Sequence, residues 1–106
     1  LLERNYPRSI HLDNAYYLNG MLELQNNRIG ESIKTFNVVN QKFAKSNKRP
    51  AAMFATGAAY QKLNLPVLAE RVFQRVIKDY PGSPEASLAW MQLRVSKVMA
   101  KTPLKK

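Results

Sequence analysis

The four residues Tyr80-Pro81-Gly82-Ser83 are the last of three related stretches in this chain. Phe43-Ala44-Lys45-Ser46 and Tyr6-Pro7-Arg8-Ser9 precede them at intervals of 37 residues, and every stretch starts with an aromatic residue and ends with a serine. A repeat of this length is typical of solenoids, in which each unit buries its apolar face against the next unit. Other residues that recur at this interval are Gly20 and Gly57, Phe36 and Phe73, Val39 and Val76, and Ala15, Ala52 and Ala89.

Between these stretches, apolar residues recur at helical spacing. Ile29, Ile33, Phe36, Val39 and Phe43 follow one another at steps of three and four, which places them on one stripe of a helix. No segment shows the alternating pattern of a strand. The sequence therefore predicts an all-α fold whose helices cover about residues 10–25, 29–45, 47–63, 66–80 and 84–100.

Turn and capping residues separate the predicted helices. Asn26-Asn27 and Asn64-Leu65-Pro66 are typical of turns, and Pro81-Gly82 ends the fourth helix. Ser46-Asn47 is predicted to cap the third helix. Ser83 is predicted to cap the fifth helix, with a proline and a carboxylate in the first turn that follows it.

The chain is predicted to form a single domain over all 106 residues, which the repeat divides into units. Leu2 matches Val39 and Val76, which lie late in their own helices, so residues 1–6 are interpreted as the remnant of a truncated helix. The chain is therefore expected to be a fragment of a longer protein, from which any targeting signal is missing. The predicted parts that follow are a first repeat at 10–45, a second at 47–80, a capping helix at 84–100 and a basic tail at 101–106.

Composition argues against an enzyme. There is no cysteine, and His11 is the single histidine, so the chain lacks the residues of thiol catalysis and of thiolate or paired-histidine metal sites. The four glycines are isolated and form no phosphate-binding loop. No apolar run approaches the length of a membrane span. We expect no catalytic residue, no cofactor, no metal site and no small-molecule substrate.

The second repeat resembles a known family of helical repeats. Gly57, Tyr60, Ala69, Phe73 and Pro81 occur in the order and spacing of the small-aromatic-small-aromatic-proline pattern of tetratricopeptide repeats. The first repeat departs from this pattern, because Glu23, Ser32 and Ala44 stand where the family has an aromatic residue, alanine and proline. The resemblance implies a right-handed superhelix of antiparallel helix pairs, with about two full repeats and a terminal capping helix.

The segment from Val72 to Ala86 permits a narrower comparison. Its Tyr-Pro-Gly-Ser-Pro junction resembles the bacterial envelope branch of the tetratricopeptide family, which includes the C-terminal repeat domain of the Tol-Pal system coordinator and the outer-membrane assembly lipoprotein. The resemblance implies a periplasmic or cell-envelope protein that acts as a scaffold and binds other envelope proteins.

The same resemblance implies a concave groove lined by the first helix of each repeat. Its residues are mostly apolar, which suits a partner peptide or an amphipathic helix. The alternative is that single members of this set only pack against neighbouring helices. The predicted groove residues are Asn14, Tyr17, Met21, Leu24 and Gln25, then Phe54, Ala58, Gln61 and Lys62, and finally Met91 and Val95, with Ala51, Leu88 and Val98 in a wider set.

The chain is strongly basic, with 17 lysines and arginines, 7 acidic residues and a formal net charge of +10. Arg71, Arg75 and Lys78 lie at helical spacing and share one face. This basic surface favours a second hypothesis, a module that binds nucleic acid or another anionic polymer or surface. The alternative is a solvated outer face. A third hypothesis is self-association through the open ends of the solenoid.

Overall fold

In a computed structural model of the protein, residues 11–101 are described, and side chains are described from residue 11 to residue 96. This part of the chain is helical, with no strand, and the predicted all-α class is confirmed. The expected remnant helix at 1–6 and the tail beyond Lys101 lie outside the described residues. The helices are α2 (Leu12–Gln25), α3 (Ile29–Lys42), α4 (Arg49–Lys62), α5 (Pro66–Asp79) and α6 (Pro84–Lys101).

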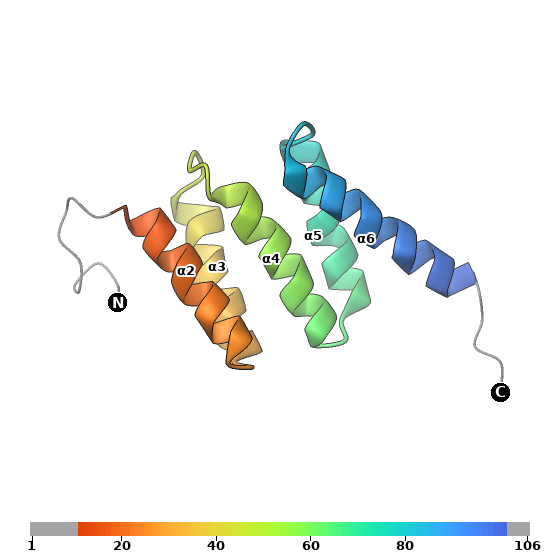
Figure 1. Ribbon diagram of the computed structural model, residues 1–106, viewed down its shortest axis with the longest axis horizontal. Helices are drawn as coiled ribbons and strands as arrows, with labels where there is room; N and C mark the ends of the chain where they lie inside the picture. Colours follow the sequence, from red (N-terminus) through yellow and green to blue (C-terminus); the bar gives the residue numbers. More distant parts are fainter. Residues whose placement is uncertain (1–10, 102–106) are drawn as a thin grey trace.

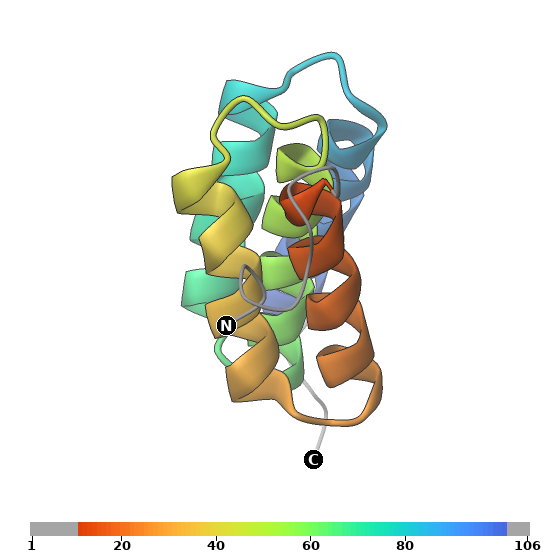
Figure 2. The ribbon, with the colours of Figure 1, turned by 90° about the vertical axis from the view of Figure 1, so that its left-hand side faces the viewer.

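The helices form an elongated array in which each helix packs on the next one along the chain (Figure 1). Helices α2, α4 and α6 lie in front in this view, and α3 and α5 lie behind them. The end-on view in Figure 2 shows α3 and α5 together on one side and α2 and α6 on the other. Within the described part, α4 contacts both α2 and α6, whereas α3 and α5 do not contact each other. This packing is that of a helical repeat.

The repeat seen in the sequence is a repeat of side-chain environments. Phe36 and Phe73 are fully buried, at 0% and 1% exposure. A Cβ atom built on Gly20 would lie 2.6 Å from Phe36 Cε1, and one built on Gly57 would lie 2.6 Å from Phe73 Cε1. Each glycine therefore gives a phenylalanine ring room to lie directly on the backbone of the partner helix. Arg94 occupies the corresponding position on α6.

The turns inside the two helix pairs also repeat. Asn27 and Asn64 have left-handed backbone conformations, with φ of 64° and 59°. Asparagine tolerates this region better than most residues and often ends helices in this way. Behind them, the Arg28 amide donates to Glu23 O at 2.8 Å, and the Leu65 amide donates to Tyr60 O at 2.9 Å. Both pairs are thus closed by the same turn, which satisfies carbonyl groups at the ends of α2 and α4.

The connection from α3 to α4 differs from the prediction. Helix α3 ends at Lys42 instead of near residue 45, and Lys48 takes the N-cap position of α4 without a side-chain cap. The prediction that Ser46-Asn47 caps this helix was wrong. Ser46 Oγ instead accepts a hydrogen bond from the Lys48 amide at 2.9 Å, within the loop before the helix. The prediction for Ser83 is confirmed, since its Oγ accepts from the Ala86 amide at 3.0 Å in the first turn of α6.

Two clusters of buried residues form the core, one for each helix pair. The first is centred on Phe36 and Val39, and the second on Phe73 and Val76. Ala52 and Ala89 are both 0% exposed at equivalent positions on α4 and α6, where a small residue lets the next pair approach closely. Along residues 11–101, no helix is long and apolar enough to cross a membrane.

Candidate functional site

An apolar groove crosses the front of the array, where α4 forms the floor between α2 and α6. It encloses a cavity of about 250 Å³. Glu85 is the only charged residue among the described residues that line it. The lining residues, which define the apolar groove below, are Tyr17, Met21 and Leu24 from α2, Ala51, Phe54, Ala55 and Ala58 from α4, and Glu85 and Leu88 from α6.

Two aromatic residues hold the groove in shape. Tyr17 packs against Phe36, with ring centroids 6.2 Å apart, and Phe54 packs against Phe73 at 5.2 Å. Tyr17 and Phe54 occupy the same position of successive repeats. Because their partner rings are buried, these side chains are fixed from behind while they remain partly exposed on the groove side. The groove is therefore largely formed before any ligand arrives.

The structure brings together part of the predicted groove. Tyr17, Met21, Leu24, Phe54 and Ala58 line the cavity, together with Ala51 and Leu88 of the wider predicted set. Sequence reasoning missed Ala55 and Glu85. Glu85 was recognised only as a helix-start residue, and no pattern showed that the first turn of α6 reaches the cavity.

Other predicted groove residues lie outside the cavity. Asn14 lines a different hollow, with Asp13 and Lys48. Gln61 Nε2 donates to Gln92 Oε1 at 3.0 Å and so joins α4 to α6. Gln25 and Lys62 are exposed at the ends of α2 and α4. These four side chains are polar, which is consistent with a position at the rim rather than in the apolar cavity.

Met91 and Val95 extend the groove along α6 without enclosing it. They are 59% and 56% exposed, and Leu88, at 45%, precedes them on the same helical stripe. The residues that correspond to Met91 in the earlier repeats are Tyr17 and Phe54, and those that correspond to Val95 are Met21 and Ala58. All four line the cavity. The front face thus carries an apolar cavity between α2 and α6 and, beside it, an exposed apolar stripe on α6. Val98 lies among the residues whose side chains are not described.

The hollow at the start of α2 contains the Asp13 carboxyl, whose pKa is lowered. The Ser46 hydroxyl donates a hydrogen bond to Asp13 Oδ2, and this bond lowers the pKa of the Asp13 carboxyl below its ordinary value. The backbone N–H of Asn14 donates to Asp13 Oδ1 at 2.8 Å and also lowers the pKa of this carboxyl. Asp13 therefore fastens the first turn of α2 to the loop before α4. His11 is exposed at the N-cap of α2 and makes no side-chain cap there.

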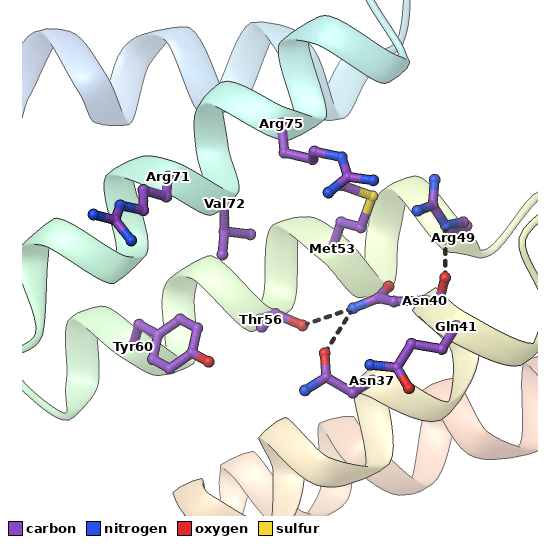
Figure 3. Close-up of a pocket in the computed structure, with 10 residues that line it drawn as sticks. All are labelled: Asn37, Asn40, Gln41, Arg49, Met53, Thr56, Tyr60, Arg71, Val72 and Arg75. Atoms are coloured by element: carbon purple, nitrogen blue, oxygen red, sulfur yellow. Dashed lines mark hydrogen bonds between the residues drawn. The ribbon is translucent and has the colours of Figure 1, made fainter.

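The rear face has a larger and more polar cavity of about 420 Å³, in the space between α3 and α5 (Figure 3). None of the described residues that line it is acidic. We call it the arginine cavity, and its lining residues are Asn37, Asn40 and Gln41 from α3, Arg49, Met53, Thr56 and Tyr60 from α4, and Arg71, Val72 and Arg75 from α5.

Arg49 closes one end of the arginine cavity. Its Nε donates to Asn40 O at 2.9 Å, at the end of α3, and its Nη1 donates to the Tyr80 hydroxyl at 3.0 Å, just after α5. Asp79 lies 3.6 Å from Arg49 Nη1 and 3.0 Å from Arg75 Nε. A guanidinium between the carbonyl ends of two helices is stabilised by both helix dipoles. Arg49 has leucine and alanine as its repeat counterparts, so the repeat pattern did not indicate this role.

The predicted basic surface is divided by the fold. Arg71 and Arg75 line the arginine cavity, whereas Lys78 is exposed outside it. Asn40 lines the cavity from α3. Its Nδ2 donates to Asn37 Oδ1 at 3.2 Å and to Thr56 Oγ1 at 3.4 Å, and its Oδ1 is buried without a hydrogen-bond partner in the described structure. Sequence reasoning found the two arginines of α5 but not the amides of α3 that face them.

Among the described residues, no group of three or more His, Asp or Glu side chains could hold a metal ion. A scan against protein-family models finds no match, and a search of curated proteins finds no similar sequence. The tetratricopeptide family and its envelope branch therefore remain a resemblance of the sequence pattern.

Proposed function

We propose that the protein is an interaction module that binds an apolar segment of a partner protein in the apolar groove. The observation that carries this proposal is the continuity of the cavity between α2 and α6 with the exposed stripe of Leu88, Met91 and Val95. Contiguous exposed apolar surface that is framed by polar residues marks interaction sites more often than ordinary surface.

The geometry favours an amphipathic helix as the bound segment. A helix presents apolar residues at steps of three and four, and such anchors fit a groove between helices. The cavity has room for a small number of apolar side chains, and Met21 and Met91 supply adaptable contacts. Gln25, Gln61 and Lys62 then form the polar rim that surrounds the apolar centre of an interface.

Two finer aspects of the proposal depend on the sequence pattern. We propose a right-handed tetratricopeptide-like superhelix, because the small residues of the second repeat follow that family's spacing. The resemblance to envelope proteins makes the bacterial envelope the first place to search for the partner. A role in binding, without catalysis, is part of the same proposal.

The experiment is a selection of peptides from a random display library on the immobilised protein, followed by affinity measurements with fluorescently labelled peptides. The selected peptides are expected to carry apolar residues at helical spacing. Leu88→Glu places a charge in the groove at a position already 45% exposed, so the fold is retained while the peptide dissociation constant rises about tenfold or more.

Val67→Glu is the matched control, because Val67 is 62% exposed on α5 and lies outside the groove. This variant is expected to bind the selected peptides like the unmodified protein. If no peptide family is enriched, or if both variants lose affinity equally, the apolar groove is not the binding site.

A further inference from the structure

We propose that the arginine cavity is a second binding site, which takes a small molecule that carries phosphate or carboxylate groups. It lies on the rear face, opposite the apolar groove, and its occupation does not depend on the proposed function. The inference rests on the balance of charge around the cavity and on hydrogen-bond donors that no described group uses.

The charge around the cavity is unbalanced. Arg49 and Arg75 share the carboxylate of Asp79, and the Arg71 guanidinium has no ion pair or hydrogen bond with another described residue. Within the described part of the chain, three guanidinium groups therefore have one carboxylate as their ion-pair partner, and that carboxylate does not line the cavity. An anionic ligand is attracted to such a site, and arginine binds phosphate and carboxylate oxygens through paired N–H groups.

Unused donors surround the space on three sides. The Arg71 guanidinium comes from α5, the Tyr60 hydroxyl from α4 and the Gln41 amide from α3, and none of the three hydrogen-bonds to another described side chain. Figure 3 shows Arg71 and Arg75 extending from one wall and Asn37 and Gln41 from the opposite wall, with α4 between them. Because these donors line one cavity from three separate helices, the site differs from a basic face on a single helix.

The size of the cavity favours a small ligand. Its volume of about 420 Å³ is within the range of small-molecule sites. Val72 and Met53 provide an apolar wall beside the charged groups, which suits an organic anion that has an uncharged part. Arg71 and Arg75 come from successive turns of α5, and Figure 3 shows their side chains extending in opposite directions, so their guanidinium groups lie toward different ends of the cavity.

The test is a titration of the protein with pyrophosphate, and separately with citrate, followed by calorimetry and by the arginine Nε–H signals in NMR spectra. Saturable binding that shifts the Arg71 signal is expected from at least one probe. The probe that binds more tightly distinguishes a phosphate ligand from a carboxylate ligand. Arg71→Gln should raise the dissociation constant about tenfold, and Tyr60→Phe, which removes only a hydroxyl group, about threefold.

Lys78→Gln is the matched control, because it removes the same charge from the same helix outside the cavity. It should change the dissociation constant less than about twofold, since Lys78 does not line the cavity and attracts the ligand only at long range, where salt screens the charge. The proposal fails if neither probe saturates, or if Lys78→Gln weakens binding as much as Arg71→Gln. Equal losses in retention on heparin or RNA for both variants, without pyrophosphate or citrate binding, would indicate a diffuse basic surface instead. Leu88→Glu should leave pyrophosphate binding unchanged, which separates this test from that of the apolar groove.

Discussion

At the residue scale, two glycines determine how closely the helices of each pair approach. Gly20 and Gly57 lie inside helices, where glycine is otherwise unfavourable. Each is retained against this cost because Phe36 or Phe73 lies where a Cβ atom would be. The sequence showed that both pairs recur at one interval, but only the structure shows that the glycine and the phenylalanine are in contact.

Gly57→Ala is therefore expected to destabilise the protein. The new methyl group forces the buried ring of Phe73 to move, at a cost of about 1–3 kcal/mol, which exceeds the gain of about 1 kcal/mol from the better helix former. Chemical denaturation would measure the free energy of unfolding. Gly30→Ala is the control, because apart from its chain neighbours and the backbone of its own helix nothing lies within 4 Å of the added Cβ, and it should be neutral or stabilising.

A double variant tests the mechanism. If the ring is the obstacle, Phe73→Leu costs less in the Gly57→Ala background than alone, so the two changes are not additive. Strict additivity would mean that the loss has another origin.

At the element scale, short polar links fix where helices begin and how they are joined. The bond between Asp13 and Ser46 connects α2 to the loop before α4. Asp13 has a lowered pKa, so the folded state binds its proton less readily than the unfolded state. Its contribution to stability is complete above the unfolded value of 3.8 and is lost as the pH falls through the lower, folded value.

Ser46→Ala should therefore lower the free energy of unfolding at pH 7, and the difference from the unmodified protein should shrink below about pH 4. Part of the loss in the free energy of unfolding should persist at all pH values, because Ser46 also accepts a hydrogen bond from the Lys48 amide. Denaturation curves between pH 2 and 7 would measure the effect, with Ser87→Ala on the exposed part of α6 as control. A difference that stays constant across this range would contradict the role of Asp13.

The elements were more predictable than their links. Every described helix was predicted, α3 from an apolar stripe at helical spacing and α4 from the capping and turn residues on either side of it. The end of α3 was placed too late, because Phe43 continues the apolar stripe although it lies beyond the last helical residue. Serine at position 46 was consistent with a helix cap or a loop, and only the path of the backbone selects the loop.

At the scale of the whole molecule, stability depends on how one helix pair is joined to the next. Arg49 contributes to that junction directly, through Asn40 at the end of α3 and Tyr80 after α5. Its side chain is only 15% exposed. The repeat pattern predicted neighbouring pairs but not this contact, which occurs once in the described array. For the same reason the arginine cavity could not be predicted, since it combines side chains from three helices.

Arg49→Gln should lower the free energy of unfolding by about 1–3 kcal/mol, because charged hydrogen bonds at a poorly exposed site are lost. Arg28→Gln is the control. Its ion pair with Glu31 is largely exposed, at 63% and 58%, and removing it should have little effect. Thermal and chemical denaturation would compare the variants. Equal stability of the two variants would show that Arg49 does not hold the pairs together.

Arg94 has a consequence for attempts to lengthen the protein. It stands at the repeat position where Gly20 and Gly57 admit a phenylalanine ring, and it has a long side chain there. A duplicate of residues 47–83 inserted before α6 would bring its own glycine for its own ring, and the register would continue. A helix like α5 attached behind α6 would meet an arginine side chain at the position where α2 and α4 have a glycine. We therefore expect the array to accept an additional repeat before α6 more readily than an additional helix behind α6.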